Sequence, residues 1–378
     1  MLVASKVYRV GVIGFAHMHV NELIDQFDRL ENVRWVACAD TQPSDPNLAQ
    51  VAGTRAANLK RALEKTGIPK RYDDYRELLE KEELDILIVC AENTRSADVT
   101  VEALSRGMHV LREKPMAASY SDALRMARAA RHNGVTVATN WPTTWRPAIR
   151  RAKELIDAGE IGRVWEVKWR NGASLGPLAY GSAHPGATIV DGRLSEAALG
   201  AEWWYQHREG GGALLDYCCY GACLASWYIP DEPISVVGTA ANLCSHFGDV
   251  EDNAVFTVRY PNALAIIEAT WTTFHVGIPT GPIIYGTEGT MVVDGNRVLV
   301  YKERGKPEPT RVIEDGSLPE GRDTIAKEFI HHLETGEPLH PTLDLAINTK
   351  VMAILDAGRR SSQSGKVELV NNPSWQIG

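Results

Sequence analysis

The sequence predicts an α/β protein of two domains, in which a doubly wound parallel sheet is followed by a second α/β domain with a large, mostly antiparallel open sheet. Its length of 378 residues exceeds what one hydrophobic core usually spans. The first 140 residues alternate short apolar runs rich in β-branched residues with amphipathic segments, which is typical of βαβ units. After Trp141, strand-like runs follow one another at hairpin spacings with few helices between them. We therefore expect domains at residues 1–140 and 141–378.

The expected elements of the first domain explain this assignment. Apolar runs with the length and composition of buried parallel strands lie at residues 7–14, 33–39, 86–91, 109–111 and 135–139. The segments between them have helical spacing, at residues 20–30, 58–65, 76–80, 96–105 and 119–133. Gly107 and Gly134 stand where a left-handed residue would end a helix. The alternation predicts a Rossmann-type domain.

The second domain begins with one more amphipathic helix, at residues 146–159, and continues with strands. The strand patterns cover residues 163–170, 234–241, 254–260, 264–273, 282–286 and 297–302. Turns such as Pro261-Asn262 and Asp294-Gly295 join consecutive strands, as in an antiparallel sheet. An apolar helical segment at residues 214–228 is expected between this sheet and the first domain, where a substrate cleft would form. A closing helix is expected at residues 343–359.

Composition and charge exclude several classes of protein. The 44% hydrophobic and 23% charged content is that of a globular, water-soluble chain. A formal net charge of −8 without a dense Lys/Arg run argues against nucleic acid and anionic membranes as partners. No apolar run reaches the roughly 18 residues of a membrane span, and the N-terminus enters a strand pattern at once, so we expect a cytoplasmic protein. The six cysteines form no C-x-x-C pair, and we expect them to be small buried residues.

The turn after the first strand is the expected phosphate-binding site, with candidate cofactor contacts at Gly14, Phe15, Ala16, His17 and Met18. Only the first glycine of the G-x-G-x-x-G fingerprint is present, because Ala16 and His19 occupy the other two glycine positions. The alternative is a strand-to-helix turn in a domain that has lost its dinucleotide. His17 and His19 could suggest a metal pair, but no third ligand accompanies them at a recognisable spacing, so no metal site is predicted.

Asp40 stands at the end of the second strand. A carboxylate there accepts hydrogen bonds from the ribose hydroxyls of the adenosine and repels a 2′-phosphate. No arginine immediately follows it to reverse this preference. The position therefore favours NAD over NADP, unless Asp40 is an ordinary solvated turn residue.

The sharpest local signal is Glu113-Lys114-Pro115, which follows a strand pattern. A charged pair at the carboxyl end of a parallel strand lies in the crevice where such sheets bind ligands. The proline ends the strand and fixes the backbone, with a cis bond as one option. Together with the Asn93 loop, the run at residues 210–216 and the turn at residues 286–290, this motif resembles the family of glucose-fructose oxidoreductase, inositol dehydrogenase and MocA. The resemblance extends from about Tyr8 to Val370.

The resemblance implies catalytic roles. Lys114 would reach the substrate hydroxyl beside the nicotinamide, where its ammonium stabilises a developing alkoxide. The family's Asp-x-Gly-x-His pattern here runs from Asp216 to Tyr220, four residues apart and so on one face of an α-helix, with tyrosine in place of histidine. Tyr220 would then exchange the substrate proton, while Asp216 orients the substrate hydroxyls or the lysine. The alternative is a core tyrosine whose hydroxyl only finds a partner.

The same resemblance implies further cofactor contacts and an assembly. The residues that fall where relatives contact the cofactor are Asn93, Glu113, Lys114, Trp141 and Arg146, although the proline and histidine that often flank the asparagine are absent here. A buried packing role for Trp141 is equally open. Relatives pair through the open face of the antiparallel sheet, so we expect a homodimer or homotetramer.

An aromatic cluster precedes the glycine run at residues 210–212. Because aromatic rings stack on the C–H faces of sugars, the candidate substrate contacts besides the catalytic residues are Trp169, His184, Trp203, Trp204 and His207. The alternative is that they only pack the segment at residues 172–212 against the domain. This segment is expected to be an active-site insertion, unless it is a surface excursion.

These features predict an oxidoreductase that transfers hydride between NAD, with NADP less favoured, and a secondary alcohol or carbonyl carbon of a sugar, cyclitol or glycoside. Redox-assisted glycoside cleavage, in which the hydride returns and NAD is retained, is a second hypothesis. A sugar- or cofactor-sensing protein without turnover is a third, motivated by the eroded glycine fingerprint and the missing histidine. The retained Glu113, Lys114 and Asp216 argue against the sensor.

Overall fold

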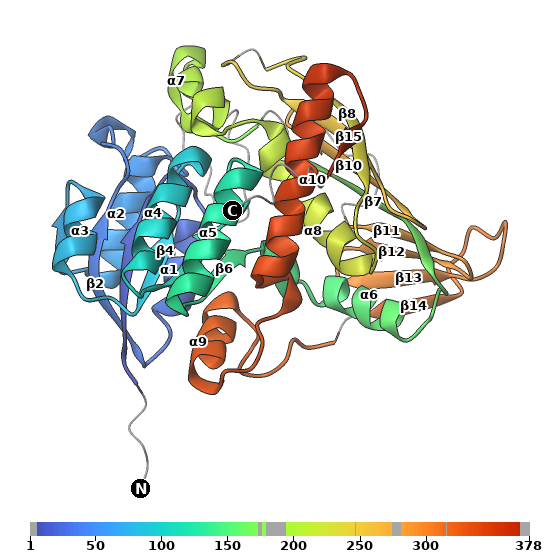
Figure 1. Cartoon of the computed structure of the whole chain (residues 1–378), viewed down its shortest axis with the longest axis horizontal. Helices are drawn as coiled ribbons and strands as arrows, with labels where there is room; N and C mark the ends of the chain where they lie inside the picture. Colours follow the sequence, from blue (N-terminus) through green and yellow to red (C-terminus); the bar gives the residue numbers. More distant parts are fainter. Residues whose placement is uncertain are drawn as a thin grey trace, which may run out of the picture. The chain divides into compact units, whose positions relative to one another are not determined.

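The computed structural model describes residues 6–172, 176–178, 194–245, 247–273, 281–314 and 316–370. The chain divides into two compact units (Figure 1). Unit 1 consists of Met1–Asn140, Pro177–Gly211 and Thr324–Leu339, and unit 2 of Trp141–Gly176, Gly212–Asp323 and His340–Gly378. Each unit is therefore built from three separate segments of the chain.

Unit 1 contains a six-stranded sheet in the order β3-β2-β1-β4-β5-β6, in which all neighbouring strands are parallel. The strands are β1 (Tyr8–Ile13), β2 (Val33–Ala39), β3 (Lys70–Tyr72), β4 (Ile86–Val89), β5 (His109–Glu113) and β6 (Val137–Asn140). The order reverses between β1 and β4, and open sheets of this kind bind ligands at the carboxyl ends of the strands beside that point. The predicted doubly wound fold is confirmed.

Several helices of unit 1 begin and end at capping residues. They are α1 (Val20–Phe27), α2 (Arg55–Thr66), α3 (Tyr75–Lys81), α4 (Asn93–Ser105), α5 (Tyr120–Asn133), α7 (Glu196–Ala201) and α9 (Ile325–Thr335), with 3₁₀ turns at Pro46–Leu48, Trp203–Tyr205 and His207–Glu209. The hydroxyls of Thr54 and Ser119 accept backbone N–H groups at the starts of α2 and α5. Gly134 ends α5 in the left-handed conformation, as predicted. α1 packs with α2 and α9, and α4 packs with α5.

Unit 2 contains a nine-stranded sheet in the order β14-β13-β12-β11-β7-β10-β9-β8-β15. The strands are β7 (Val164–Gly172), β8 (Ser235–Ala241), β9 (Asn253–Arg259), β10 (Leu264–Thr270), β11 (Ile283–Gly286), β12 (Thr290–Asp294), β13 (Arg297–Tyr301), β14 (Arg311–Glu314) and β15 (Glu368–Leu369). β7 and β10 pair in parallel, and the other neighbours pair antiparallel. The predicted large, mostly antiparallel sheet is confirmed.

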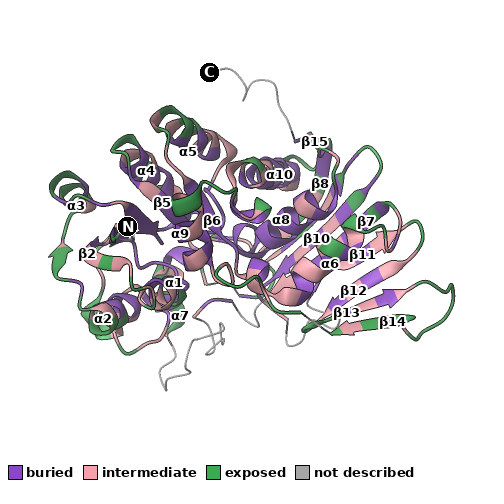
Figure 2. Ribbon diagram, turned by 90° about the horizontal axis from the view of Figure 1, so that it is seen from below, coloured by how far each residue is buried: buried purple, intermediate pink, exposed green. Residues whose placement is uncertain are grey.

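Helices cover one face of this sheet (Figure 2). They are α6 (Pro147–Asp157), α8 (Cys219–Tyr228) and α10 (Leu345–Ser364), with 3₁₀ turns at Pro142–Trp145 and Pro341–Leu343 and a π-helical turn at Leu214–Cys218. α8 packs against β7, β10 and α10. The expected closing helix starts at Leu345 because the Asp344 carboxylate caps it, and it continues past Arg359 until Gly365 adopts the left-handed conformation.

Large apolar side chains are exposed on the other face of the sheet. Val237, Val255, Leu264 and Val312 are 38–47% exposed. The strand register puts these side chains on one face of the sheet. Val255 lies opposite Glu268, which is on the same face of β10 as Leu264. Val255 also lies opposite Thr239, which is on the same face of β8 as Val237. We call this surface the open face.

The cysteine prediction needs one correction. Five of the six thiols are buried, but Cys244 is exposed. It lies in a turn after β8, where the carboxylate of Asp252 accepts the backbone N–H groups of residues 243–245 and holds the chain at the surface. Within the described ranges, every helix is too short or too polar to cross a membrane.

Candidate functional site

The turn that follows β1 starts at Gly14, in a backbone conformation that requires glycine. Gly14 has a φ of +90°, and a Cβ there would lie 2.5 Å from the backbone nitrogen of Ala91. The amide of Phe15 donates to the carboxylate of Asp40, and the amide of Ala16 donates to the carbonyl of Cys90. The turn is thus fixed to the ends of the two strands that flank β1.

Two tryptophans of the predicted aromatic cluster cover this turn. The indole N–H of Trp203 donates to the carbonyl oxygen of Ala16 at 2.9 Å. Its ring lies 4.0 Å from that of Trp204, which meets the ring of His17 edge-on at 4.7 Å. His207 is exposed in the following turn. Trp203 and Trp204 therefore pack on the phosphate turn, which supports the packing alternative for these two rings.

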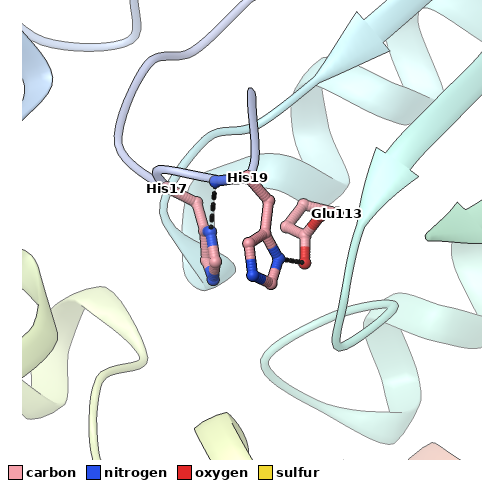
Figure 3. A group of neighbouring side chains, drawn as sticks. All are labelled: His17, His19 and Glu113. Atoms are coloured by element: carbon pink, nitrogen blue, oxygen red, sulfur yellow. Dashed lines mark hydrogen bonds and ion pairs between the residues drawn. The ribbon is translucent and has the colours of Figure 1, made fainter. Parts of the chain in front are cut away.

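The carboxylate of Glu113 lies at the centre of a buried polar cluster (Figure 3). Nδ1 of His19 lies 2.7 Å from one carboxylate oxygen, and the side-chain amide of Asn140 donates to the other at 2.8 Å. The backbone N–H of His19 donates to Nδ1 of His17 at 3.1 Å. Lys114, the residue after Glu113, is only 2% exposed. The peptide bond between Lys114 and Pro115 is cis, which confirms the cis bond that the sequence analysis gave as one option.

Asp40 belongs to a second, partly buried cluster. Its Oδ1 accepts hydrogen bonds from the amides of Phe15 and Thr41 and from the guanidinium of Arg55, which also binds Glu92. The hydroxyl of Thr41 donates to Glu92 at 2.6 Å. Burial raises the pKa of Asp40, and the charge of Arg55 opposes this rise.

The other oxygen of Asp40 fits a cofactor ribose. Asp40 Oδ2 is buried and has no hydrogen-bond partner among the described residues. Asp40 also lines a cavity of about 690 Å³ at the carboxyl ends of β2 and β3, together with Gln42, Ser44, Lys60, Arg71 and Tyr72. A carboxylate oxygen in this position suits the ribose hydroxyls of a dinucleotide. The residues present therefore fit NAD at this end of the sheet.

The side chain of Asn93 makes a hydrogen bond within unit 1. Its side-chain amide donates to the carbonyl of Gly210 at 2.8 Å, and Arg95 pairs with Glu209 at 3.1 Å. Both contacts hold the end of the segment at residues 194–211 to α4. A contact of Asn93 with the nicotinamide ribose stays a prediction.

In unit 2, Asp216 and Tyr220 are both buried. The indole N–H of Trp271 donates to Asp216 Oδ2 at 3.0 Å. The ring of Tyr220 lies 5.5 Å from that of Trp141 and 6.1 Å from that of Trp169. Asp216 lies in the π-helical turn, where the i→i+5 hydrogen bonds add one residue to the turn. The predicted shared face of Asp216 and Tyr220 assumed α-helical spacing, so that spacing alone does not place them on one face.

Trp141 and Arg146 make local contacts in unit 2. The indole of Trp141 donates to Asn348 at 2.9 Å, and Arg146 donates to the carbonyl of Gly295 at 3.1 Å. His184 lies outside the described residues. Because Lys114 belongs to unit 1 while Asp216 and Tyr220 belong to unit 2, their cooperation stays a prediction.

Sequence reasoning missed four members of the two clusters: Thr41, Arg55, Glu92 and Asn140. Arg55 and Glu92 lie 37 positions apart, so no local spacing connects them. Glu92 lies three residues after the end of the buried strand β4, and a carboxylate at that edge of the sheet was the signal that the sequence offered. Asn140 ends β6, the strand beside Glu113.

Comparisons with known proteins agree on a family. A family model described as an oxidoreductase family with an NAD-binding Rossmann fold matches residues 8–141, and one described as the GFO/IDH/MocA C-terminal domain matches residues 149–292. The myo-inositol 2-dehydrogenase of Thermotoga maritima is 24% identical over 349 residues, covering 87% of this chain and 89% of that protein. The 1,5-anhydro-D-fructose reductase of Ensifer adhaerens is 28% identical over 63% of this chain and 65% of its own length.

Solved structures share the fold over almost the whole chain. A levoglucosan dehydrogenase in complex with NADH and L-sorbose has a TM-score of 0.73 and 19% identity, covering 97% of this chain and 100% of that one. The WlbA dehydrogenase of Bordetella pertussis, in complex with NADH and UDP-GlcNAcA, gives the same four values.

Proposed function

Since the chain belongs to the oxidoreductase family that combines an NAD-binding Rossmann fold with a GFO/IDH/MocA C-terminal domain, we propose that it is an NAD-dependent dehydrogenase of sugars, cyclitols or glycosides. The observation that carries this proposal is the buried pair Glu113 and Lys114 at the carboxyl end of β5. The names of two relatives support the substrate class, because one is a dehydrogenase of an inositol and the other is a reductase of an anhydro sugar.

The proposed chemistry follows from the side chains. Bound oxidised NAD supplies the hydride acceptor for a secondary alcohol carbon. The ammonium of Lys114 stabilises the negative charge that develops on the substrate oxygen, and burial strengthens this interaction because little water competes. Tyr220 exchanges the substrate proton, and Asp216, oriented by Trp271, binds a substrate hydroxyl.

The charges around Asp40 support NAD rather than NADP. The carboxylates of Asp40 and Glu92 both pair with Arg55, and Glu92 also lies 3.9 Å from Arg95, while the second oxygen of Asp40 has no partner among the described residues at the carboxyl end of β2. A 2′-phosphate placed there would be repelled.

The experiment that tests the proposal combines cofactor binding with turnover. We expect NADH to bind with a micromolar or lower Kd in a fluorescence titration and NADPH to bind more weakly. A panel of inositols, aldoses, anhydro sugars and glycosides then identifies the substrate by reduction of NAD. If the wild-type protein bound neither nucleotide, the proposal would be wrong and a sensor of another ligand would remain. Glycoside cleavage without net reduction of NAD would instead identify the redox-assisted reaction.

The Lys114→Met variant tests the catalytic role. It removes the charge and keeps a side chain of similar length, so kcat/KM should fall at least ~100-fold while the Kd for NADH changes little. Lys81→Met, at an exposed position on α3, is the control. Wild-type turnover by Lys114→Met would refute this role.

A further inference from the structure

The cluster at His19 and Glu113 lies where three strands end side by side. Glu113 is the last residue of β5, and the turn with His17 and His19 leaves β1 and crosses the end of β4, since the amide of Ala16 bonds to Cys90. β4 separates β1 from β5 in the sheet. This is the edge beside the reversal of strand order, where sheets of this type bind ligands.

The hydrogen bonds define the protonation state of His19. A carboxylate only accepts hydrogen bonds. One oxygen of Glu113 contacts Nδ1 of His19, and the other accepts a hydrogen bond from the side-chain amide of Asn140. Nδ1 of His19 therefore carries a proton, which leaves the lone pair of Nε2 as the basic site of the neutral ring. The carboxylate also stabilises the imidazolium that forms when Nε2 takes up a proton, as in a His–carboxylate pair of a hydrolase. The side chain of His19 does not cap α1 although His19 is the N-cap residue.

His17 has the opposite tautomer to His19. Its Nδ1 accepts the backbone N–H of His19, so in the neutral ring Nε2 carries the proton. The two rings lie 4.2 Å apart, which disfavours a charge on both at once. The titratable groups that contact His19 thus include Glu113 and His17, and Lys114 follows Glu113 in the chain.

A metal centre is the rival interpretation of the same side chains. One ligand atom from each of His17, His19 and Glu113 lies within 4.8 Å of the others. The hydrogen bonds argue against it, because a metal on Nε2 of His17 would need that nitrogen deprotonated while Nδ1 already accepts an amide proton. A metal on His17 therefore requires the turn to open.

We propose that His19, oriented and charge-balanced by Glu113, is the acid/base group that finally accepts the substrate proton, a role that rests on the proposed function. During oxidation the substrate gives up its O–H proton, which ends on Nε2 of His19. The C–H hydride leaves with both electrons to the oxidised nicotinamide, and the C–O bond becomes a carbonyl. The imidazolium then returns its proton to solvent. An imidazole on the Rossmann unit thus replaces the histidine that Tyr220 displaces from the family pattern.

The first test needs no turnover. In ¹⁵N-labelled protein without cofactor, the ring signals of His19, assigned by their loss in His19→Gln, should be those of the Nδ1–H form, and Glu113→Gln should shift them. Signals of the Nε2–H form would overturn the proposal.

The second test uses kinetics. His19→Gln should lower kcat/KM ~100-fold or more while the Kd for NADH changes less than about threefold. Oxidation needs neutral His19 and should speed up as pH rises, whereas reduction needs the imidazolium and should slow down. His19→Gln should lose both trends, and added imidazole should restore activity to His19→Ala. His132→Gln, exposed at the end of α5, is the control.

The outcomes separate this inference from the function on which it rests. His19→Gln with the wild-type kcat/KM and pH profile would overturn the inference and leave the dehydrogenase intact. Stoichiometric Zn²⁺ binding that both His17→Gln and His19→Gln abolish would establish the metal centre instead. A wild-type protein without nucleotide binding or turnover would remove the proposed function and the inference together.

Discussion

Asp40 has a structural role through one carboxylate oxygen, and we propose that its other oxygen recognises the cofactor. One oxygen binds the phosphate turn and Arg55, while the other has no partner among the described residues. Such a division lets the residue fix the end of β2 and still offer an acceptor to a ligand. The sequence predicted the acceptor but not Arg55, whose guanidinium lies 15 positions away in the chain.

This arrangement predicts the effect of Asp40→Asn on cofactor choice. Loss of one negative charge leaves Arg55 balanced by Glu92 alone, so a 2′-phosphate is repelled less. We expect the ratio of the Kd values for NADPH and NADH to fall at least ~10-fold, which corresponds to ~1.4 kcal/mol. Fluorescence titration with both nucleotides measures it. Asp98→Asn, exposed on α4, should keep the wild-type ratio, and an unchanged ratio in Asp40→Asn would contradict the assignment.

At the scale of the elements, the amino ends of the parallel strands are joined by one carboxylate. Asp85, just before β4, accepts hydrogen bonds from the backbone N–H and the guanidinium of Arg9 on β1, and pairs with Lys6. Its own backbone also bonds to Arg9 and to His109 on β5. Burial alone would raise the pKa of Asp85, but the hydrogen bonds from Arg9 outweigh it and lower the pKa to about 2.

A pH dependence of stability follows from this pKa. Because the folded-state pKa is below that of the unfolded chain, Asp85 contributes stability above about pH 4 that is lost as pH falls toward 2. The partners are partly exposed, so we expect ~1 kcal/mol. Urea unfolding of Asp85→Asn at pH 6 should show this loss, and the difference from wild type should vanish near pH 2. Glu83→Gln, an exposed partner of Arg9, should cost less at pH 6. Equal stability of Asp85→Asn and wild type at pH 6 would refute the estimate.

For the whole molecule, the open face of the nine-stranded sheet is the main apolar surface that the described strands leave uncovered. Its side chains Val237, Val255, Leu264 and Val312 share the face with charged residues such as Glu268. Exposed apolar patches of this kind commonly mark protein interfaces. The expected homodimer or homotetramer would bury this surface.

Analytical ultracentrifugation tests this expectation. Wild type should sediment as a dimer or tetramer at micromolar concentration, and Val255→Lys should shift it toward the monomer, because an unpaired charge would be buried in the interface. Leu243→Lys is the matched control, since Leu243 is exposed in the turn after β8 rather than on a strand. A wild-type monomer, or an unaffected Val255→Lys oligomer, would exclude this interface.

The sequence by itself determined the order of strands and helices in the first 140 residues except for the short edge strand β3, which it missed, and it determined the glycine turn at Gly14 and the Glu113-Lys114-Pro115 motif. These features depend on local requirements, namely hydrophobic period, left-handed backbone and fixed proline geometry, which neighbouring residues display directly. The boundaries of the closing helix were only approximate, because caps such as Asp344 and Gly365 decide where a helix ends.

Only the tertiary structure decided which side chains meet at the carboxyl edge of the parallel sheet. His19 reaches Glu113 across 94 positions, and Arg55 reaches Glu92 across 37. Those pairs exist because the sheet order places β1, β4 and β5 side by side, and because the start of α2 lies at the residues that follow β2 and β4, an arrangement that no local spacing encodes. The two histidines of the turn looked like a metal pair without a third ligand in the sequence. In the folded chain they lie beside the carboxylate of Glu113, and this contact, which the sequence did not show, is the basis of the proposed acid/base role of His19.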